Sequence, residues 1–131
     1  FYQQFKDKEI EAVVGIESRG FIFAAPLALK LGCSLAIARK PGKLPYETVS
    51  AEYSLEYGVD TLELHTDAFN PGEKVLIMDD LLATGGTAKA AGKLVKKLKG
   101  KIECFAFLIN LVELKGIDML KPHPIFCIVE D

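Results

Sequence analysis

Short apolar runs recur along this chain, separated by polar turns and by segments of helical periodicity. An unbroken apolar run is typical of a strand that is buried on both faces of a parallel sheet. The clearest run is residues 75–78, which follow an Asn-Pro-Gly turn at residues 70–72. Further runs of this kind lie at residues 12–16, 102–112 and 124–129. The pattern therefore predicts a largely parallel sheet.

Helical periodicity is clearest after residue 87. From Ala88 to Leu98 the apolar residues recur at helical spacing, lysines occupy the other face, and Gly100 is expected to stop the helix. Another helix should follow the first strand and run to about Leu31, with Pro26 in its first turn or at a kink. Shorter helical segments are expected within residues 1–11, as the end of a helix, and at residues 113–120.

Residues 39–66 predict an excursion from the sheet. Residues 39–46 are basic and contain two prolines and a glycine, which exclude a regular element. Candidate strands at residues 51–57 and 59–66 meet at Gly58, and an excursion of this length is often a lid. Together the elements predict an α/β domain with a central, mostly parallel sheet flanked by helices and an antiparallel lid.

The amino-acid composition argues against several classes of function. The chain has 131 residues, enough for one domain, and its 16 basic and 18 acidic residues give no electrostatic case for binding nucleic acid. The odd number of cysteines, all in apolar runs, predicts reduced thiols. Neither histidine clusters with other metal ligands. Without a signal peptide or a transmembrane run, the chain is expected to be cytoplasmic, and its first residue, Phe1, predicts a fragment or a missing earlier segment.

The strongest candidate chemistry follows the strand at residues 75–78. Asp79 and Asp80 precede the turn Ala-Thr-Gly-Gly-Thr at residues 83–87, which leads directly into the predicted helix. Glycines and the unpaired N–H groups of a helix start suit a phosphate monoester, whereas two carboxylates suit a ribose diol or a metal beside it. The spacing excludes the ATP-type loop and the dinucleotide loop. A solvated acidic turn after a buried strand explains the glycines, but not the acids and threonines together.

A second candidate loop follows the first strand. Residues 17–21, Glu-Ser-Arg-Gly-Phe, place a glycine, a hydroxyl and a guanidinium at a strand's carboxyl end. A guanidinium beside free backbone N–H groups suits the oxygen cluster of a polyphosphate. The alternative is that Glu17 and Arg19 merely flank a surface turn. The presence of the first motif favours the functional interpretation.

Four segments in this order resemble the adenine phosphoribosyltransferases, a branch of the type I phosphoribosyltransferase family. They are residues 17–21, 39–45, 53–58 and 79–87, and the match runs from about Ala12 to the C-terminus. The resemblance implies the family's fold, Mg²⁺ as cofactor, and transfer of a phosphoribosyl group from 5-phosphoribosyl 1-diphosphate to adenine, giving AMP and pyrophosphate in purine salvage. It also implies a homodimer and one domain, residues 1–131, without the family's N-terminal hood over the base.

The resemblance also assigns roles to individual residues. Asp79 and Asp80 would bind the ribose hydroxyls and lie nearest a metal that is held mainly through the substrate. Glu56 would be the general acid or base, and Arg19 the group that stabilises the leaving pyrophosphate. The peptide at residues 17–18 or its neighbour would be cis. The other substrate-binding residues would be Ala83, Thr84, Gly85, Gly86 and Thr87 for the 5′-phosphate, Ser18 and Gly20 for pyrophosphate, Arg39, Lys40 and Lys43 for added positive charge, and Phe21, Leu81 and Tyr57 near the base.

Three rival functions are also considered. The first is a phosphoribosyltransferase for another purine, because related enzymes share the phosphate motif. The second is a non-catalytic regulator that senses 5-phosphoribosyl 1-diphosphate, although such a protein could lose Glu56 and the lid, which are present here. The third is a generic nucleotide-binding domain, which the absence of an ATP-type loop disfavours.

Overall fold

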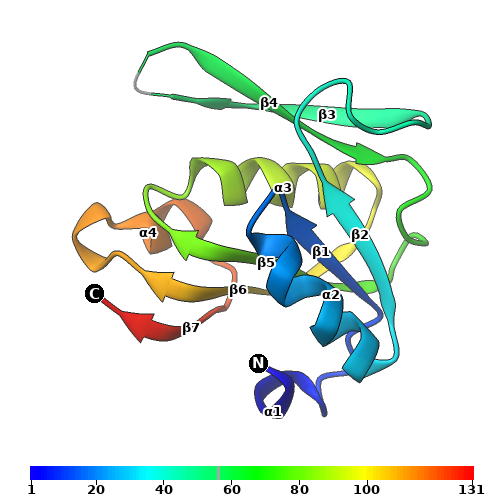
Figure 1. Ribbon diagram of the computed structural model, residues 1–131, viewed down its shortest axis with the longest axis horizontal. Helices are drawn as coiled ribbons and strands as arrows, with labels where there is room; N and C mark the ends of the chain where they lie inside the picture. The colour runs from blue at the N-terminus through cyan, green and yellow to red at the C-terminus, as the bar shows by residue number, and fades with distance from the viewer. Residues whose placement is uncertain (56) are drawn as a thin grey trace.

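A five-stranded parallel sheet forms the centre of the protein (Figure 1). The computed structural model describes residues 1–55 and 57–131. The strand order is β2-β1-β5-β6-β7, and every pairing is parallel. The strands are β1 (Ala12–Ile16), β2 (Ser34–Ala38), β5 (Lys74–Leu82), β6 (Lys101–Asn110) and β7 (Ile125–Glu130). The expected parallel α/β architecture is confirmed.

Helices cover both faces of the sheet, which is why its central strands are apolar on both sides. Helix α2 (Gly20–Leu31) and the short α1 (Tyr2–Phe5) pack on the face that contains Val13 and Leu76. Helix α3 (Gly86–Lys97) packs on the opposite face, with Val14 and Ile77. The 3-10 turn η1 (Val112–Leu114) and helix α4 (Gly116–Leu120) connect β6 to β7. None of the described helices is long and apolar enough to cross a membrane.

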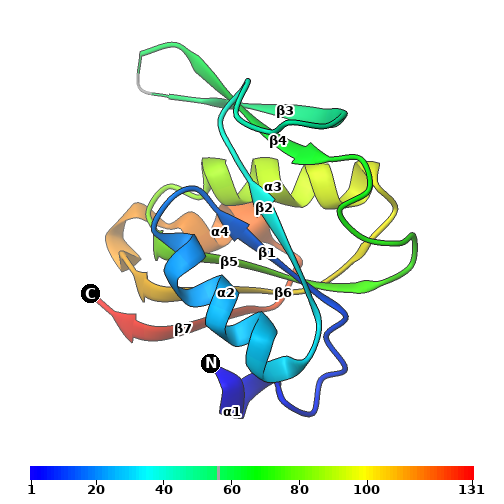
Figure 2. The same ribbon diagram turned by 45° about the vertical axis from the view of Figure 1, so that its right-hand side comes forward.

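The excursion forms a separate antiparallel hairpin of β3 (Thr48–Ser54) and β4 (Val59–His65). Leu62 and Leu64 join the core cluster that contains Leu94 and Val95 of α3. Figures 1 and 2 both show the hairpin on the side of α3 that faces away from the sheet. An isolated bridge between Arg39 and Glu63 ties it to the end of β2.

Several element boundaries differ from the sequence predictions. Strand β5 continues to Leu82, so the two acids belong to the strand rather than to the turn after it. Helix α3 begins at Gly86 and ends at Lys97, before Gly100. Pro26 lies in the middle of α2, not in its first turn; the exposed position of Pro26 keeps its ring on the solvent side, and the helix continues to Leu31.

The connectivity fixes where a ligand can bind. If the hairpin is left out and the five strands are renumbered along the chain, their order across the sheet is 2-1-3-4-5. This is a doubly wound arrangement with its switch point between β1 and β5. In such sheets the ligand crevice lies at the carboxyl ends of the strands on either side of the switch point. Gly15 pairs with Met78 in the β1–β5 register, so the loop after Ile16 meets the segment that begins at Asp79.

Candidate functional site

The turn between β5 and α3 forms a small hollow of about 80 Å³. Gly85 is the N-cap residue of α3 and has a φ of 91°, a left-handed conformation that glycine adopts most readily. No side chain caps α3, so its first N–H groups have no side-chain acceptor. The hollow is lined by Asp79, Leu81, Leu82, Ala83, Thr84, Gly85, Gly86, Thr87 and Ala88. An anion in this hollow would take the place of the missing cap.

Helix α4 supports this turn from behind. A Cβ added at Gly85 would lie 2.8 Å from the Gly116 carbonyl oxygen and 2.9 Å from the Met119 Cβ. A Cβ added at Gly116 would collide with the Ala83 carbonyl oxygen. The sequence analysis did not identify Gly116 or Met119 as parts of the site. No local sequence signal marks them, because their contact with the turn joins residues about thirty positions apart; Lys115, the residue before Gly116, has a φ of 55°.

The two acids of β5 are in different electrostatic states. Burial, followed by the neighbouring Asp80, raises the pKa of Asp79 from 3.8 to about 8. An Asp79 carboxyl oxygen accepts the Asp80 backbone N–H at 2.8 Å. The Asp80 carboxylate forms an ion pair with Arg19, at 2.7 Å between Nε and Oδ2. Asp79 therefore retains a proton near neutral pH unless a cation or a hydrogen-bond donor arrives to stabilise its charge.

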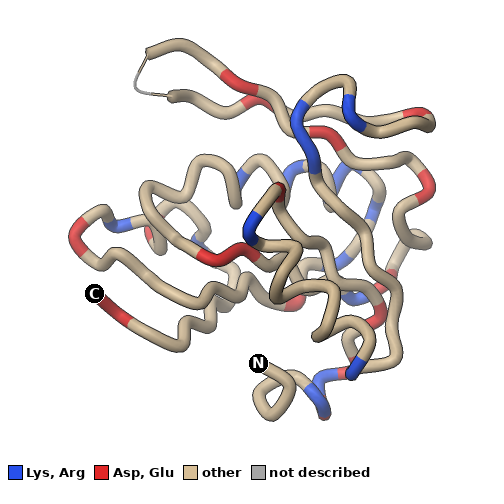
Figure 3. Tube along the Cα trace, viewed as in Figure 1, with Lys and Arg blue, Asp and Glu red and all other residues tan. Residues whose placement is uncertain are grey.

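The loop after β1 packs directly against these acids. In Figure 3 a basic segment of this loop lies beside the acidic end of β5, and the Arg19–Asp80 ion pair joins the two. A Cβ added at Gly20 would lie 3.0 Å from the Met78 carbonyl oxygen and 3.1 Å from an Asp79 carboxyl oxygen, so a side chain here would press against the end of β5. The Glu17–Ser18 peptide is cis, as the resemblance implied. The two motifs identified from sequence thus form one site.

Glu17 organises the basic loop that follows β2. Its carboxylate accepts hydrogen bonds from the Arg39 side chain at 3.2 Å, from the Lys40 backbone N–H at 3.0 Å, and from Lys43. Partial burial tends to raise the pKa of Glu17, but the bonds from Lys43, Lys40 and Arg39 outweigh it and hold that pKa below its ordinary value. The side chain of Lys40 bonds Tyr53 and Asp60 on the hairpin. The basic loop therefore links the β1 loop to the hairpin.

The residues expected near the base lie less close together than the residues of the two loops. Phe21 and Leu81 are half-buried, and Leu81 lines the hollow beside residues 83–87, the candidate phosphate loop. Tyr57 is 88% exposed near the hairpin tip. Glu56, the expected general acid or base, lies outside the described residues. A groove of about 630 Å³ between the hairpin and α3 includes Ser54 and Thr84, so the hairpin and the phosphate loop face a common space.

Metal ligands are sparse. The described residues contain no group of three or more His, Cys, Asp or Glu side chains that could hold a metal ion. Mg²⁺ is commonly held by one or two carboxylates together with substrate oxygens, rather than by a complete protein cage. The Asp79–Asp80 pair is a donor set that fits this mode.

Comparisons with known proteins agree with this geometry. Residues 1–123 match the family model of the phosphoribosyl transferase domain. Over 116 residues the chain is 58% identical to the adenine phosphoribosyltransferase of Shewanella loihica, covering 88% of this chain and 64% of that protein. The crystal structure of the Thermoanaerobacter pseudethanolicus adenine phosphoribosyltransferase superposes with a TM-score of 0.95 at 45% identity, covering 98% of this chain and 75% of that one.

A third relative has been solved with ligands. The adenine phosphoribosyltransferase of Saccharomyces cerevisiae, complexed with adenine and an imino-altritol bisphosphate, superposes with a TM-score of 0.91 at 42% identity. This match covers 97% of the present chain and 72% of the yeast one. All three relatives are longer than the chain described here.

Proposed function

Because this chain belongs to the adenine phosphoribosyltransferases of the phosphoribosyl transferase domain family, we propose that it catalyses their reaction. The 5-phosphoribosyl group passes from 5-phosphoribosyl 1-diphosphate to adenine, which gives AMP and pyrophosphate. The observation that supports this most directly is the meeting of three groups at the switch point. They are an uncapped helix start, a partly buried acid pair and an arginine bound to one of those acids.

Each end of the sugar diphosphate has a matching group. The N–H groups at the start of α3, with Thr84 and Thr87, hold the 5′-phosphate. Asp79 and Asp80 accept hydrogen bonds from the ribose hydroxyls, which stabilises ionised Asp79. Arg19 and the backbone of the β1 loop hold the pyrophosphate. Fixing the substrate at both ends aligns the ribose C1 with the attacking base nitrogen, so much of the rate gain is positioning.

The proposed reaction separates charge, and the site must stabilise both of the charges that form. Breaking the bond between the ribose C1 and the diphosphate oxygen leaves positive charge on the ring and negative charge on the departing group. Asp79 and Asp80 lie on the side of the positive charge, and Arg19 on the side of the negative charge. Mg²⁺, when bound beside the acid pair, supplies further neutralisation of the diphosphate. Glu56 removes the proton from the base nitrogen that attacks, and hairpin closure excludes water.

The proposed assembly is a homodimer that buries an apolar face of α2 and β2. Ile22 and Leu29 on α2 are 67% and 84% exposed, and Leu35 on the edge strand β2 is 41% exposed. Residues 22, 25, 26 and 29 lie at helical spacing and all are exposed, so they form one continuous stripe. The proposed location is the cytoplasm, where the three cysteines, which are free thiols here, stay reduced.

A pyrophosphate-release assay tests the proposed reaction. The chain is supplied with the sugar diphosphate, Mg²⁺ and adenine, guanine, hypoxanthine or xanthine in turn, and a version extended at its N-terminus is tested in parallel. Release with adenine alone is expected. Release with a different base indicates a phosphoribosyltransferase for another purine. Sugar-diphosphate binding without release in either version indicates a sensor.

A further inference from the structure

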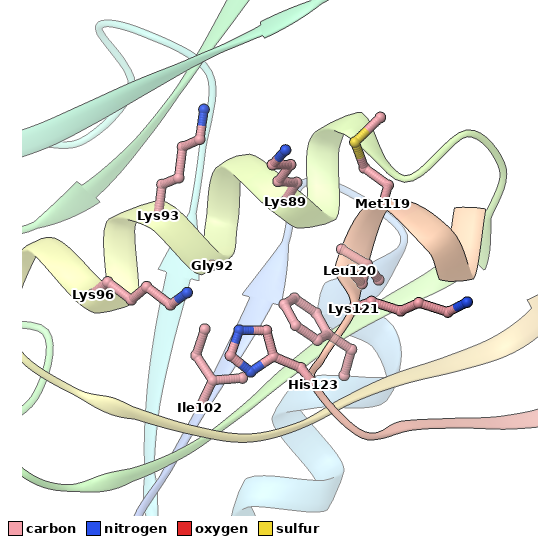
Figure 4. A pocket seen from close by; sticks show the side chains of 10 residues that line it. Lys89, Gly92, Lys93, Lys96, Ile102, Met119, Leu120, Lys121 and His123 are labelled. Carbon is pink, nitrogen blue, oxygen red and sulfur yellow. The ribbon is translucent and has the colours of Figure 1, made fainter. Parts of the chain in front are cut away.

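A basic hollow lies between α3 and the sheet, beside the groove that separates α3 from the hairpin (Figure 4). It encloses about 170 Å³ between α3, the start of β6 and the segment that joins α4 to β7. Its floor is apolar and includes Phe105, Ile102 and Leu120. Its rim contains Lys96, Lys121 and His123. Lys89 and Lys93 also line it, and both of these lysines line the groove between α3 and the hairpin as well.

The positive charge of this hollow is poorly compensated. Among the described residues, no carboxylate lines it, and none lies within salt-bridge distance of Lys89, Lys93 or Lys96. Lys121 alone has such a partner, Asp118, at 3.0 Å. Lysines around one concavity repel each other, although Lys93 extends away from His123 in Figure 4, and a bound anion would relieve that repulsion.

His123 adds a donor at the rim of the hollow. Its ring is half-buried and packs edge-on against Phe105, with 5.7 Å between the ring centroids. Figure 4 shows the Lys96 side chain extending from α3 toward this ring. Burial, and then the charge of Lys96, lower the pKa of His123. The imidazole is therefore neutral near pH 7 and donates a single N–H in the absence of an anion.

We propose that this hollow is a second anion site, separate from the phosphate loop, that binds a small polyphosphate or phosphate ester. The two hollows have no lining residue in common among those described. A compact ligand is favoured over nucleic acid, because the lysines surround a small concavity with an apolar floor and the whole chain has a net charge of −2. The site lies beside Met119, which also contacts the turn at Gly85.

The test uses the two histidines as reporters, since the chain has only His65 and His123. Inorganic tripolyphosphate is titrated into the intact chain at constant ionic strength while both imidazole ring signals are followed by NMR. The His123 signal is expected to shift in a saturable way, and its apparent pKa to rise by roughly half a unit or more. The His65 signal should not respond. A His123 response equal to that caused by sodium chloride would overturn the proposal.

Charge variants identify the groups responsible. The double variant Lys93→Gln, Lys96→Gln should weaken tripolyphosphate binding by about tenfold or more, whereas Lys101→Gln, an exposed lysine outside the hollow, should change it by less than about twofold. Equal losses of tripolyphosphate affinity in both variants would show that the general surface charge attracts the anion, and would refute a defined site. Tighter binding of a short single-stranded oligonucleotide of equal charge would also refute it. Unchanged His65 signals verify that the variants remain folded.

Discussion

Asp79, a proposed ribose-binding residue, weakens the fold that contains it at neutral and higher pH. The folded chain holds a proton on this carboxyl up to about pH 8, whereas the unfolded chain releases it near the ordinary value of 3.8. A carboxyl whose pKa is raised in the folded state stabilises least at high pH, so stability is lost as the pH rises from about 4 to about 8. In the proposed function, hydrogen bonds from the bound ribose hydroxyls provide the compensating contacts.

Replacing Asp79 by asparagine should therefore stabilise the free protein and impair binding. The amide keeps an oxygen for the Asp80 N–H, but it cannot ionise. The free energy of unfolding is expected to increase by roughly 2 to 4 kcal/mol at pH 8, with almost no change near pH 4. The Michaelis constant for the sugar diphosphate should increase by about tenfold. Thermal unfolding across this pH range and steady-state kinetics measure the two effects.

The exposed Asp67 provides the control. Asp67→Asn should leave both the pH profile of stability and the kinetics close to those of the parent. A gain for Asp79→Asn that is independent of pH would contradict a protonated Asp79, because only an ionisation can give the predicted slope.

At the scale of elements, the phosphate loop depends on α4 as much as on its own glycines. Gly116→Ala would press a methyl group onto Ala83 and Leu82. We expect a loss of roughly 1 to 3 kcal/mol in stability, together with a higher Michaelis constant for the sugar diphosphate. Chemical denaturation and kinetics test this. Gly32→Ala is the control: Gly32 has a φ of 70° and no atom close to an added Cβ, so it should lose stability alone.

The hairpin is the element that we propose closes over the site. If hairpin closure brings Glu56 to the base, Glu56→Ala should lower turnover by about a hundredfold while the Michaelis constant for the sugar diphosphate changes much less. Glu47→Ala, an exposed acid before β3, is the matched control. Equal losses of turnover and of sugar-diphosphate binding would remove Glu56 from the acid–base role. Single-turnover kinetics separate the two quantities.

The elements also show what could be predicted from the sequence. The meeting of the two loops at one edge of the sheet was predicted correctly, because unbroken apolar runs mark the parallel strands and such strands direct their carboxyl ends to one edge. The contact between Gly116 and Ala83 could not be predicted, since it joins residues far apart in the chain through backbone atoms alone. The role of the Glu17 side chain as acceptor for the basic loop was missed because it too depends on contacts distant in sequence. Its partners lie more than twenty positions away.

At the scale of the whole molecule, the α2–β2 face makes a prediction about assembly. Leu29→Lys should convert the proposed homodimer into a monomer, because it replaces the most exposed apolar side chain of the stripe by a charge. Ile128→Lys, on β7 at the other edge of the sheet, should not change the assembly, although Ile128 is also 49% exposed. Sedimentation velocity distinguishes the two species. A parent chain that stays monomeric at high concentration would contradict the proposed dimer.

Because all strands of the central sheet are parallel, the turns before the strands lie at the edge of the sheet opposite the proposed site. Among the described residues, the groups assigned to the proposed reaction lie at or beyond the carboxyl ends of the strands or near the hairpin tip, so we expect the turns before the strands to take no part in it. Gly72, in the turn before β5, is exposed and has no atom within 4 Å of an added Cβ. A fluorescent domain inserted there should leave turnover within about twofold of the parent. The turn at Gly72 is therefore a suitable place to attach a reporter domain.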